Sequence, residues 1–428
     1  MSYRKKFEKI YKIIKKEKNI IIIIVISLLY NGLQYTLIPL IITNDSYDYI
    51  LLSENLFDFH SIYFGIRTPL YPLIIKCCNY FCTDLNYIII FQLLLNCISA
   101  VLIFNITKFL KNINTAILAS LIFIFFPASL FANAILTESL SVFLFILFLY
   151  LFIKSKMNNN ILVILLTSIV LTLLIFNRPQ YLLFLLSLVL FFLIFKYPYR
   201  FYLIIFIPII LSFIWIYQVK NVTGICSMST LIGYNIINHT GKYIEFAPKE
   251  YDRLKEIYIK KRDENMKIKG YQEFTIWEVR EELQSKLKLN KIELSKLLIQ
   301  VSLNLIFDHP IKYLSSVWSA MKQTLTFPDY FQNIKNTYYF RILSPFYQLL
   351  IGFGLIGGIF IIIKRRVGKF EYHFILLTLL LTNLIASSVF DFGENNRFFI
   401  PSYFIIFIWS AISFNILSNH VKSKIVDE

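Results

Sequence analysis

Long apolar runs dominate this chain and recur at short intervals along it. The runs lie near residues 19–43, 86–107, 113–131, 137–153, 160–177, 180–195, 200–219, 346–363, 371–390 and 398–417. A helix of roughly 20 apolar residues is long enough to cross a hydrocarbon core of roughly 30 Å. The pattern therefore predicts an all-α polytopic membrane protein with about ten transmembrane helices.

The composition supports lipid as the solvent. Of 428 residues, 57% are hydrophobic and 16% are charged, and the mean hydropathy is +0.63. Soluble domains are roughly 45–50% apolar and about 25% charged, so an ordinary soluble protein is excluded. The formal net charge of +17 does not gather in one patch but recurs at the ends of apolar runs. We therefore expect no nucleic acid among the partners of this chain.

Alternate junctions between the runs carry most of the Lys and Arg residues. These cations lie in the tail 1–18, at Lys108 and Lys111, Lys154 and Lys156, Lys196 and Arg200, Lys364, Arg365, Arg366 and Lys369, and Lys422 and Lys424. Because cytoplasmic loops collect Lys and Arg, we expect a multi-pass protein of the cell membrane with both termini in the cytoplasm. The predicted organisation is a basic tail 1–18, a membrane domain 19–219 with an external loop 44–85, an extracytoplasmic helical segment 220–345, membrane helices 346–417 and a tail 418–428.

The extracytoplasmic segment has the spacing of amphipathic helices. One apolar stripe consists of Leu294, Leu297, Leu298, Val301 and Leu305. Such a stripe either lies along the membrane or packs in a core. The packing interpretation is the simpler one, since most helical stripes of this kind are buried.

Two acids open the external loop. Asp45 and Asp48 are three residues apart, so on a helix they would share one face. That face would suit a divalent cation, or a base acting on an acceptor hydroxyl group. The alternative is structural, because Asn44 or Asp45 can cap the start of the helix.

Four external cations, one of them Lys76, run against the topological trend. Arg67 lies in a turn with Pro69 and Pro72, Arg178 precedes Pro179, and Arg397 precedes the last apolar run. Guanidinium groups form bidentate hydrogen bonds to phosphate, so an anionic ligand would explain them. Arg67 can instead snorkel or pair with an acid. Two further acids, Glu138 and Glu394, return to the same predicted side, where Glu138 either favours a helix dipole or lines a cavity.

The order of these motifs resembles the glycosyltransferase C superfamily, more narrowly the bacterial relatives of protein O-mannosyltransferases and lipid A aminoarabinose transferases. The resemblance covers most of residues 20–417. It rests on Asp45 with Tyr49, the turn Arg67-Thr68-Pro69-Leu70-Tyr71-Pro72, Leu136-Thr137-Glu138, Asn177-Arg178-Pro179 and Arg397-Phe398-Phe399-Ile400-Pro401.

What this resemblance implies is an extracytoplasmic active site. The enzyme would transfer a sugar, a hexose or pentose, from a polyprenyl phosphate to an external glycan, lipid or protein, with inversion. Asp45 would be catalytic, accepting the acceptor's proton or orienting it, and Arg67, Arg178 and Arg397 would bind the donor phosphate. Tyr49, Pro69, Tyr71 and Glu394 would shape the site.

The chain departs from the superfamily in its first loop. The Asp-Glu pair common there is absent, because Ser46 follows Asp45. Whether Asp48 or Glu138 supplies a second acid or a metal ligand, and whether a divalent cation is needed, therefore stays open.

Two other function classes share some of these features. A polysaccharide polymerase or ligase would also combine many spans with one large external segment, but it could work without the early acid. A lipid or oligosaccharide transporter would place polar residues through several mid-membrane helices, whereas here the charges gather at one interface.

Overall fold

The computed structural model describes residues 3–56, 58, 64–82, 84–326, 338–364 and 369–427. In these ranges the secondary structure is helical, apart from one isolated bridge between Ile41 and Ala134. Arg365 and Arg366 of the predicted cytoplasmic cluster lie outside the described residues, as do the side chains of the N-terminal tail up to residue 16 and of Lys422 and Lys424.

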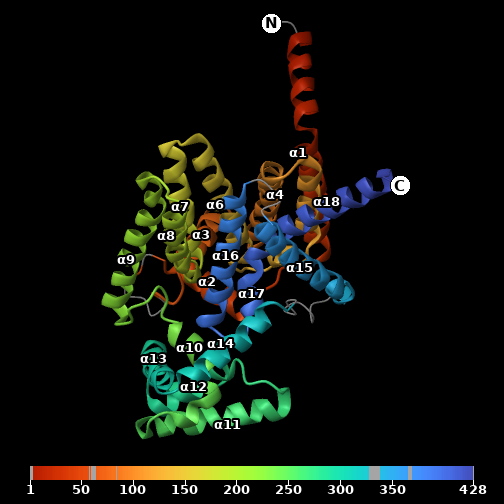
Figure 1. The fold of residues 1–428 in the computed structure, drawn as a ribbon. Helices are drawn as coiled ribbons and strands as arrows, with labels where there is room; N and C mark the ends of the chain where they lie inside the picture. The colour runs from red at the N-terminus through yellow and green to blue at the C-terminus, as the bar shows by residue number, and fades with distance from the viewer. Residues whose placement is uncertain are drawn as a thin grey trace.

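Helices that are long and apolar enough to span a membrane form the bulk of the molecule (Figure 1). Seven such stretches are found in the described residues: Glu17–Leu37 in α1 (Tyr3–Leu37), α4 (Asn86–Leu110), α6 (Glu138–Asn158), Tyr199–Thr223 around α9 (Leu203–Thr223), Pro345–Lys364 in α15 (Tyr338–Lys364), α16 (Phe370–Val389), and Asn395–Val421, which includes α17 (Asn395–Phe399) and most of α18 (Tyr403–Asp427). Three shorter apolar helices join them, α5 (Ile113–Phe125), α7 (Ile161–Asn177) and α8 (Leu183–Ile194). The predicted class, an all-α polytopic membrane protein, is confirmed.

Proline residues set where several helices end. The run predicted to reach residue 43 is helical only to Leu37, since Pro39 disfavours helical backbone in the residue before it. The run predicted to reach residue 131 ends at Phe125, and Pro127 begins a 3-10 turn over Pro127–Asn133. The chain regains helical geometry only at Glu138. The two irregular segments are joined to each other, since the Asn133 amide donates to the Ile38 carbonyl at 2.9 Å.

The centre of the bundle is α18, which packs against α15 and α5, and the edges are α1, α9 and α15. Within the span Asn395–Val421, 78% of the most apolar window is buried, against 22–28% for the spans in α1, α9 and α15. Aromatic rings fill much of the core: the ring centres of Phe126 and Phe407 are 4.6 Å apart with the rings tilted, and Phe145 lies edge-on to Phe404 at 5.2 Å. The peripheral helices expose Leu and Ile side chains, as expected of surfaces that face lipid.

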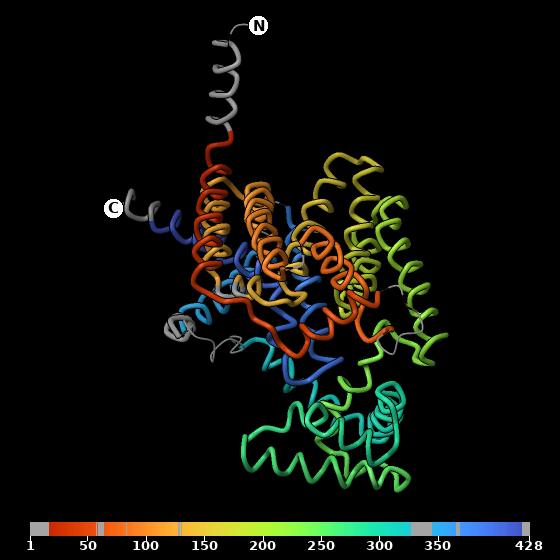
Figure 2. The backbone as a smooth tube through the Cα atoms, turned by 180° about the vertical axis from the view of Figure 1, so that it is seen from behind, coloured from red at the N-terminus to blue at the C-terminus, as the bar shows by residue number. Residues whose placement is uncertain are grey.

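A separate helical segment extends from one end of the bundle (Figures 1 and 2). It comprises α10 (Ile232–Thr240), α11 (Asp252–Lys269), α12 (Thr275–Leu287), α13 (Lys291–Asp308) and α14 (Pro310–Thr324). The stripe Leu294, Leu298, Val301 and Leu305 is buried in a core of its own with side chains from α10 and α12. The packing interpretation of that stripe therefore holds for these four residues.

Polar contacts attach this segment to the bundle just after α16. The hydroxyl of Tyr313 in α14 donates to the carbonyl of Val389 at 2.7 Å, and the Asn238 amide in α10 donates to Asp391 at 2.8 Å. The N-terminus lies at the opposite end of the bundle from α10–α14, as Figure 1 shows. The helix α2 (Asn44–Glu54) and α17 lie at the end near the segment, so the motifs singled out in the sequence meet there.

Candidate functional site

The first acid of the site lies at the start of α2. The helix is capped by Thr43, whose side chain accepts from the Ser46 amide at 3.3 Å, while the Ser46 hydroxyl accepts from the Thr43 amide at 3.0 Å. The interpretation that Asn44 or Asp45 caps this helix was therefore wrong. Because the cap is supplied elsewhere, the Asp45 carboxylate is available to the site. It shares a helix face with Asp48, and both accept hydrogen bonds from Arg67 Nη2, at 2.5 and 3.3 Å.

Arg67 is held by the turn that precedes α3 (Leu70–Phe81). Gly65 takes a φ of +74°, and a Cβ there would lie 3.2 Å from Val219, so glycine suits this bend. The guanidinium lies 5.2 Å from the ring centre of Tyr49, which packs edge-on against Tyr71 at 5.0 Å. Arg67 thus lies against the Tyr49 ring, which Tyr71 in turn supports edge-on.

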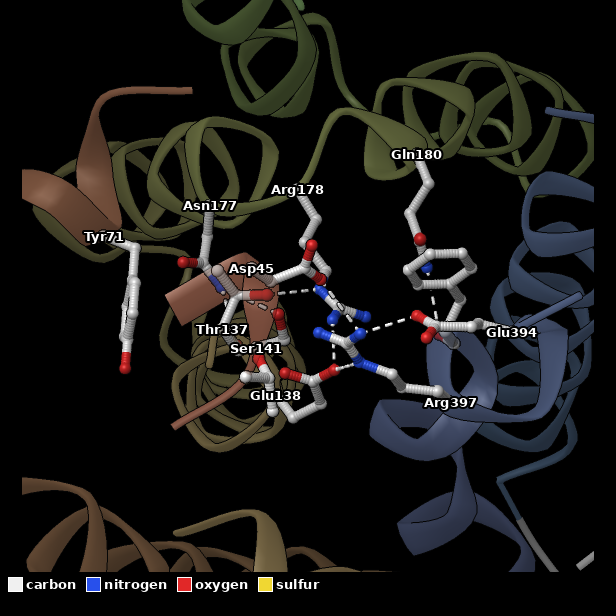
Figure 3. Close-up of polar contacts among 12 residues, drawn as sticks. Asp45, Tyr71, Thr137, Glu138, Ser141, Asn177, Arg178, Gln180, Glu394 and Arg397 are labelled. Carbon is white, nitrogen blue, oxygen red and sulfur yellow. Dashed lines mark hydrogen bonds and ion pairs between the residues drawn. The ribbon is translucent and has the colours of Figure 1, made fainter. Parts of the chain in front are cut away.

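The most buried part of the site joins Glu138 to two arginines (Figure 3). Glu138 is fully buried and pairs with Arg178 Nη2 at 2.6 Å and with Arg397 Nε. Arg397, only 2% exposed, also places Nη1 3.0 Å from Asp45 Oδ2 and 2.6 Å from Glu394 Oε2. One guanidinium therefore connects carboxylates from α2, α6 and the turn before α17.

Arg178 is positioned by the break between α7 and α8. Its Nε donates to Thr137 Oγ1 at 2.7 Å, and the neighbouring Asn177 amide donates to the Thr137 carbonyl at 3.0 Å and to the Ser141 hydroxyl at 2.7 Å. The guanidinium lies 5.2 Å from the ring centre of Phe398. The two predicted motifs around residues 138 and 178 are consequently one hydrogen-bonded unit.

Electrostatics differ sharply between two of the acids. Burial alone would raise the pKa of Asp45, but the adjacent Arg67 and Arg397 guanidinium groups hold it well below its usual range. Burial raises the pKa of Glu394, and the nearby Asp45 carboxylate adds to that effect against the attraction of Arg397. Asp45 is therefore a stable anion at neutral pH, and a weak base.

A cavity of about 320 Å³ opens beside these charges. Of the predicted residues, Asp45, Tyr49, Arg67, Arg178 and Arg397 line it. The lining also has an apolar part, to which Leu182, Leu183, Ile216, Met228 and Phe390 contribute. The other predicted residues do not line the cavity but contact or support the residues that line it. They are Asp48, Pro69, Tyr71, Glu138 and Glu394.

Two donor atoms of the site lack a hydrogen-bond partner in the part of the chain that the structure describes. Arg67 Nε and Arg178 Nη1 are buried and have no hydrogen-bond partner among the described residues. Buried donors are normally satisfied, so an acceptor from outside the protein is the natural partner for both. Because both arginines line the cavity, an anion there would supply it.

The acids do not fit a metal in this arrangement. Asp45, Asp48 and Glu138 each pair with at least one guanidinium group, which a divalent cation would have to displace. Over the described ranges, no group of three or more His, Cys, Asp or Glu side chains is placed to hold a metal ion. We therefore assign no step to a metal.

Several further polar residues of this region were not predicted from the sequence. Gln180 and Asp391 line the cavity, and Lys291 of α13 places Nζ 3.8 Å from Asp48 Oδ1. Gln180 could have been predicted, because it is a polar residue directly after the Arg178-Pro179 break. Asp391 and Lys291 had no such signal, since each is one acid or base among ordinary turn and surface residues.

Comparison with known proteins places this site on a known fold. No protein-family profile and no curated protein sequence matches the chain. Among solved structures, the oligosaccharyltransferase AglB of Archaeoglobus fulgidus is similar in three states. In complex with an inhibitory peptide and a dolichol-phosphate it is 13% identical with a TM-score of 0.50, covering 97% of this chain and 52% of that one. Tethered to an acceptor peptide with the NVT sequon it is 11% identical with a TM-score of 0.51, covering 97% and 51%. In the apo form it is 12% identical with a TM-score of 0.53, covering 95% and 52%.

The likeness shows the fold, which this chain shares with the solved oligosaccharyltransferase; the resemblance to the glycosyltransferase C superfamily stays a prediction. The chain spans about half the length of the solved protein that it matches. The narrower resemblance to protein O-mannosyltransferases and aminoarabinose transferases stays a prediction.

Proposed function

We propose that this chain is an integral-membrane glycosyltransferase that moves a sugar from a polyprenyl-phosphate donor to an extracytoplasmic glycan, lipid or protein. The observation that carries the proposal is the pair of buried, unpartnered N–H groups on Arg67 and Arg178 beside one cavity. A donor phosphate would accept from both. It would also lie near Arg397, so that three guanidinium groups stabilise the charge that develops as the phosphate leaves.

The cavity suits both ends of such a donor. Its charged part includes Asp45 of α2, Arg178 after α7 and Arg397 of α17. Its apolar part includes Leu182 of the turn between α7 and α8, Leu183 of α8 and Ile216 of α9. The apolar part would receive the first isoprene units, because hydrocarbon prefers apolar surroundings to water. The solved oligosaccharyltransferase of similar fold was captured with a dolichol-phosphate, which supports a lipid-phosphate donor.

The reaction needs one displacement at the anomeric carbon. The acceptor oxygen forms a bond to that carbon, the bond from carbon to the phosphate oxygen breaks, and its electron pair stays on the phosphate. Attack from the side opposite the phosphate inverts the configuration. Asp45 takes part by fixing the directions of Arg67 and Arg397, to which its two oxygens are bound. Such fixed placement is where positioning and electrostatic catalysis gain most.

The membrane orientation follows from the same proposal. Two cations of the predicted cytoplasmic side, Lys154 and Lys156, lie at the opposite end of α6 from Glu138 of the site. With that end in the cytoplasm, the cavity and α10–α14 would be extracytoplasmic. Several residues between Cys226 and Asn235 line part of the cavity, so the segment 220–345 is also suited to choose the acceptor.

Sugar transfer by the purified protein in lipid nanodiscs tests the proposal. Undecaprenyl-phosphate glucose, mannose and arabinose would be offered with oligosaccharides, lipid-linked glycans and hydroxyl-bearing peptides. We expect donor-dependent product from the wild type and from Lys286→Gln, a substitution on the exposed surface of α12. Asp45→Asn and Arg67→Ala should lose it while keeping the wild-type elution volume and melting temperature.

Other results would favour the other classes. Product that survives Asp45→Asn points to a polymerase or ligase that works without this acid. Movement of labelled lipid between leaflets without any sugar transfer points to a transporter. Failure of both donor binding and transfer across the panel would refute the proposed function.

A further inference from the structure

One acid of the cavity has no role in the arrangement described so far. Asp391 follows α16 in the loop Phe390-Asp391-Phe392-Gly393 and lines the cavity with Asp45 and Arg397. Gly393 takes a φ of +136°, a conformation that glycine adopts readily. The loop thus turns back sharply between the end of α16 and α17, which brings Asp391 toward the cavity.

The position of Asp391 is fixed by hydrogen bonds from both sides. Its Oδ1 accepts from the Asn238 amide and from the Phe392 backbone amide, both at 2.8 Å. Its backbone carbonyl accepts from the Asn395 amide at 2.7 Å and lies 2.9 Å from His239 Nε2. All of these contacts use Oδ1 or the backbone, so Oδ2 is left without a hydrogen bond from the described residues.

Asp391 differs from Asp45 in its charged neighbours. No Lys or Arg of the described residues forms an ion pair with it, whereas Asp45 is bound by two guanidinium groups. The groups around it are Asp45 on α2, Glu394 on its own loop, Arg397 on α17, which pairs with other acids, and His239 on α10. Lys242 is turned to the Phe392 ring, 3.5 Å from its centre.

These surroundings bring the pKa of the Asp391 carboxyl close to neutral pH. Burial raises the pKa of Asp391 to about 7, and the Glu394 and Asp45 carboxylates add to the rise against the Asn238 and Phe392 hydrogen bonds. Burial lowers the pKa of His239 to about 4, so that ring is neutral at pH 7 and adds no charge. A base whose pKa lies near the working pH is the efficient kind for general catalysis.

We propose that Asp391 is the proton acceptor of the transfer reaction, because it is the cavity carboxylate that carries a free oxygen and no cation. The inference rests on the proposed function. As the acceptor oxygen bonds to the anomeric carbon, its proton passes to Asp391 Oδ2, and the bond to the phosphate oxygen breaks with its electron pair going to the phosphate. The Asp45 oxygens remain on Arg67 and Arg397 throughout.

Asp391→Asn is the decisive variant, since the amide oxygen still accepts from Asn238 and Phe392 while the group can no longer take a proton. We expect transfer to fall about 100-fold, the lower end of what a general base contributes. Binding of an undecaprenyl-phosphate sugar should stay within about twofold of wild type, because no phosphate-binding arginine is changed. Lys286→Gln is the matched control and should transfer at the wild-type rate.

The pH profile separates a base from a merely structural residue. For the wild type, kcat/KM should fall about tenfold per pH unit below pH 7, as Asp391 takes up a proton before the reaction. That acidic limb should be missing in Asp391→Asn. In Asn238→Ala the limb should move to higher pH, since the lost hydrogen bond had stabilised the charged form.

Each failure has a distinct meaning. Wild-type turnover in Asp391→Asn, with its acidic limb kept, overturns the inference and leaves the proposed function standing. If Asp391→Asn does not fold, an unmoved limb in Asn238→Ala overturns it instead. A wild type that neither binds nor uses any donor of the panel overturns the proposed function, and the inference with it.

Discussion

The buried cluster beside the cavity and the exposed surface of α12 use ion pairs in opposite ways. At the end of the bundle, Arg397 and Glu138 are 2% and 0% exposed, and they pair with further charged groups on both sides. In the external segment, Lys286 and Glu282 pair along α12 while 60% and 48% exposed. Water can replace either partner of the exposed pair, whereas water has no access to replace a partner of the buried pair.

This difference separates charges kept for function from charges that keep a surface soluble. Burying Arg397 and Glu138 removes both charges from water, and the free energy gained from their attraction does little more than offset this desolvation penalty. Apolar side chains would fill the same space at least as stably. We infer that the buried cluster persists because it places guanidinium groups beside the cavity, while the external segment is held together by its apolar core.

The largest expected effect is that of Arg397→Met. It leaves Glu138 with a single guanidinium partner and removes one partner each from Asp45 and Glu394. Removing one member of a buried ionic cluster typically costs roughly 3–5 kcal/mol, so we expect a large fall in melting temperature and no transfer. The fall in melting temperature is measured by thermal unfolding in detergent, with size-exclusion chromatography as the readout.

Adding Glu138→Gln to that variant tests the cause. The double variant should melt at a higher temperature than Arg397→Met alone, because it no longer buries the same excess of negative charge. Simple additivity of the two losses would show that Arg397 stabilises the bundle by packing rather than by its charge.

Packing in the external segment is tested by Gly233→Ala. A Cβ at Gly233 in α10 would lie 2.2 Å from the Ser295 carbonyl oxygen, so α10 and α13 would have to move apart. Overpacking of this kind typically costs roughly 1–3 kcal/mol. We expect faster proteolysis of the external segment. A shift of α10 should also weaken the hydrogen bond from Asn238 that holds Asp391 in position.

Gly352→Ala is the matched control for that substitution. Nothing lies within 4 Å of the Cβ it would add in α15, and alanine favours a helix. Its proteolysis pattern should be that of the wild type. If Gly233→Ala also left the proteolysis pattern unchanged, α10 would be more loosely packed than the described contacts imply.

Arg67→Gln should weaken donor binding without unfolding the protein. Its side chain is 21% exposed, so its ion pairs contribute less to stability than those of Arg397. Loss of a charge-assisted hydrogen bond to phosphate predicts about 10-fold weaker binding of an undecaprenyl-phosphate sugar. The wild-type affinity should fall with added salt more steeply than that of the variant. An unchanged affinity would show that Arg67 serves Asp45 and Asp48 alone.

The sequence predicted the helices better than it predicted the site. Apolar runs are long and unambiguous, so their number and order could be read directly, and the errors lay at Pro39 and Pro127. The arginines at positions 67, 178 and 397 stood out because a cation on the external side needs a reason.

What could not be predicted depends on contacts between distant segments. Asp391 differs from any other turn residue only because Asn238, 153 positions away, donates to it, and because no Lys or Arg of the described ranges pairs with it. Likewise, a sequence does not show that Glu138 lies between Arg178 and Arg397. Thr43 was missed as the cap because its partner is Ser46 rather than the usual Glu or Gln.

The smallest effect is expected for Lys286→Ala. Lys286 and Glu282 lie four positions apart on an exposed helix face, with Nζ 2.6 Å from Oε1. The Lys286 pair lowers the pKa of Glu282, and a lowered pKa lends stability that is present at neutral pH and lost as acid protonates the carboxylate. Because water solvates both groups, we expect the melting temperature at pH 7 to be unchanged within error, and transfer to equal that of the wild type. A measurable loss at low salt that disappears at high salt would show that charges of the external segment act together over its surface, and the contrast with the buried cluster would then be one of degree.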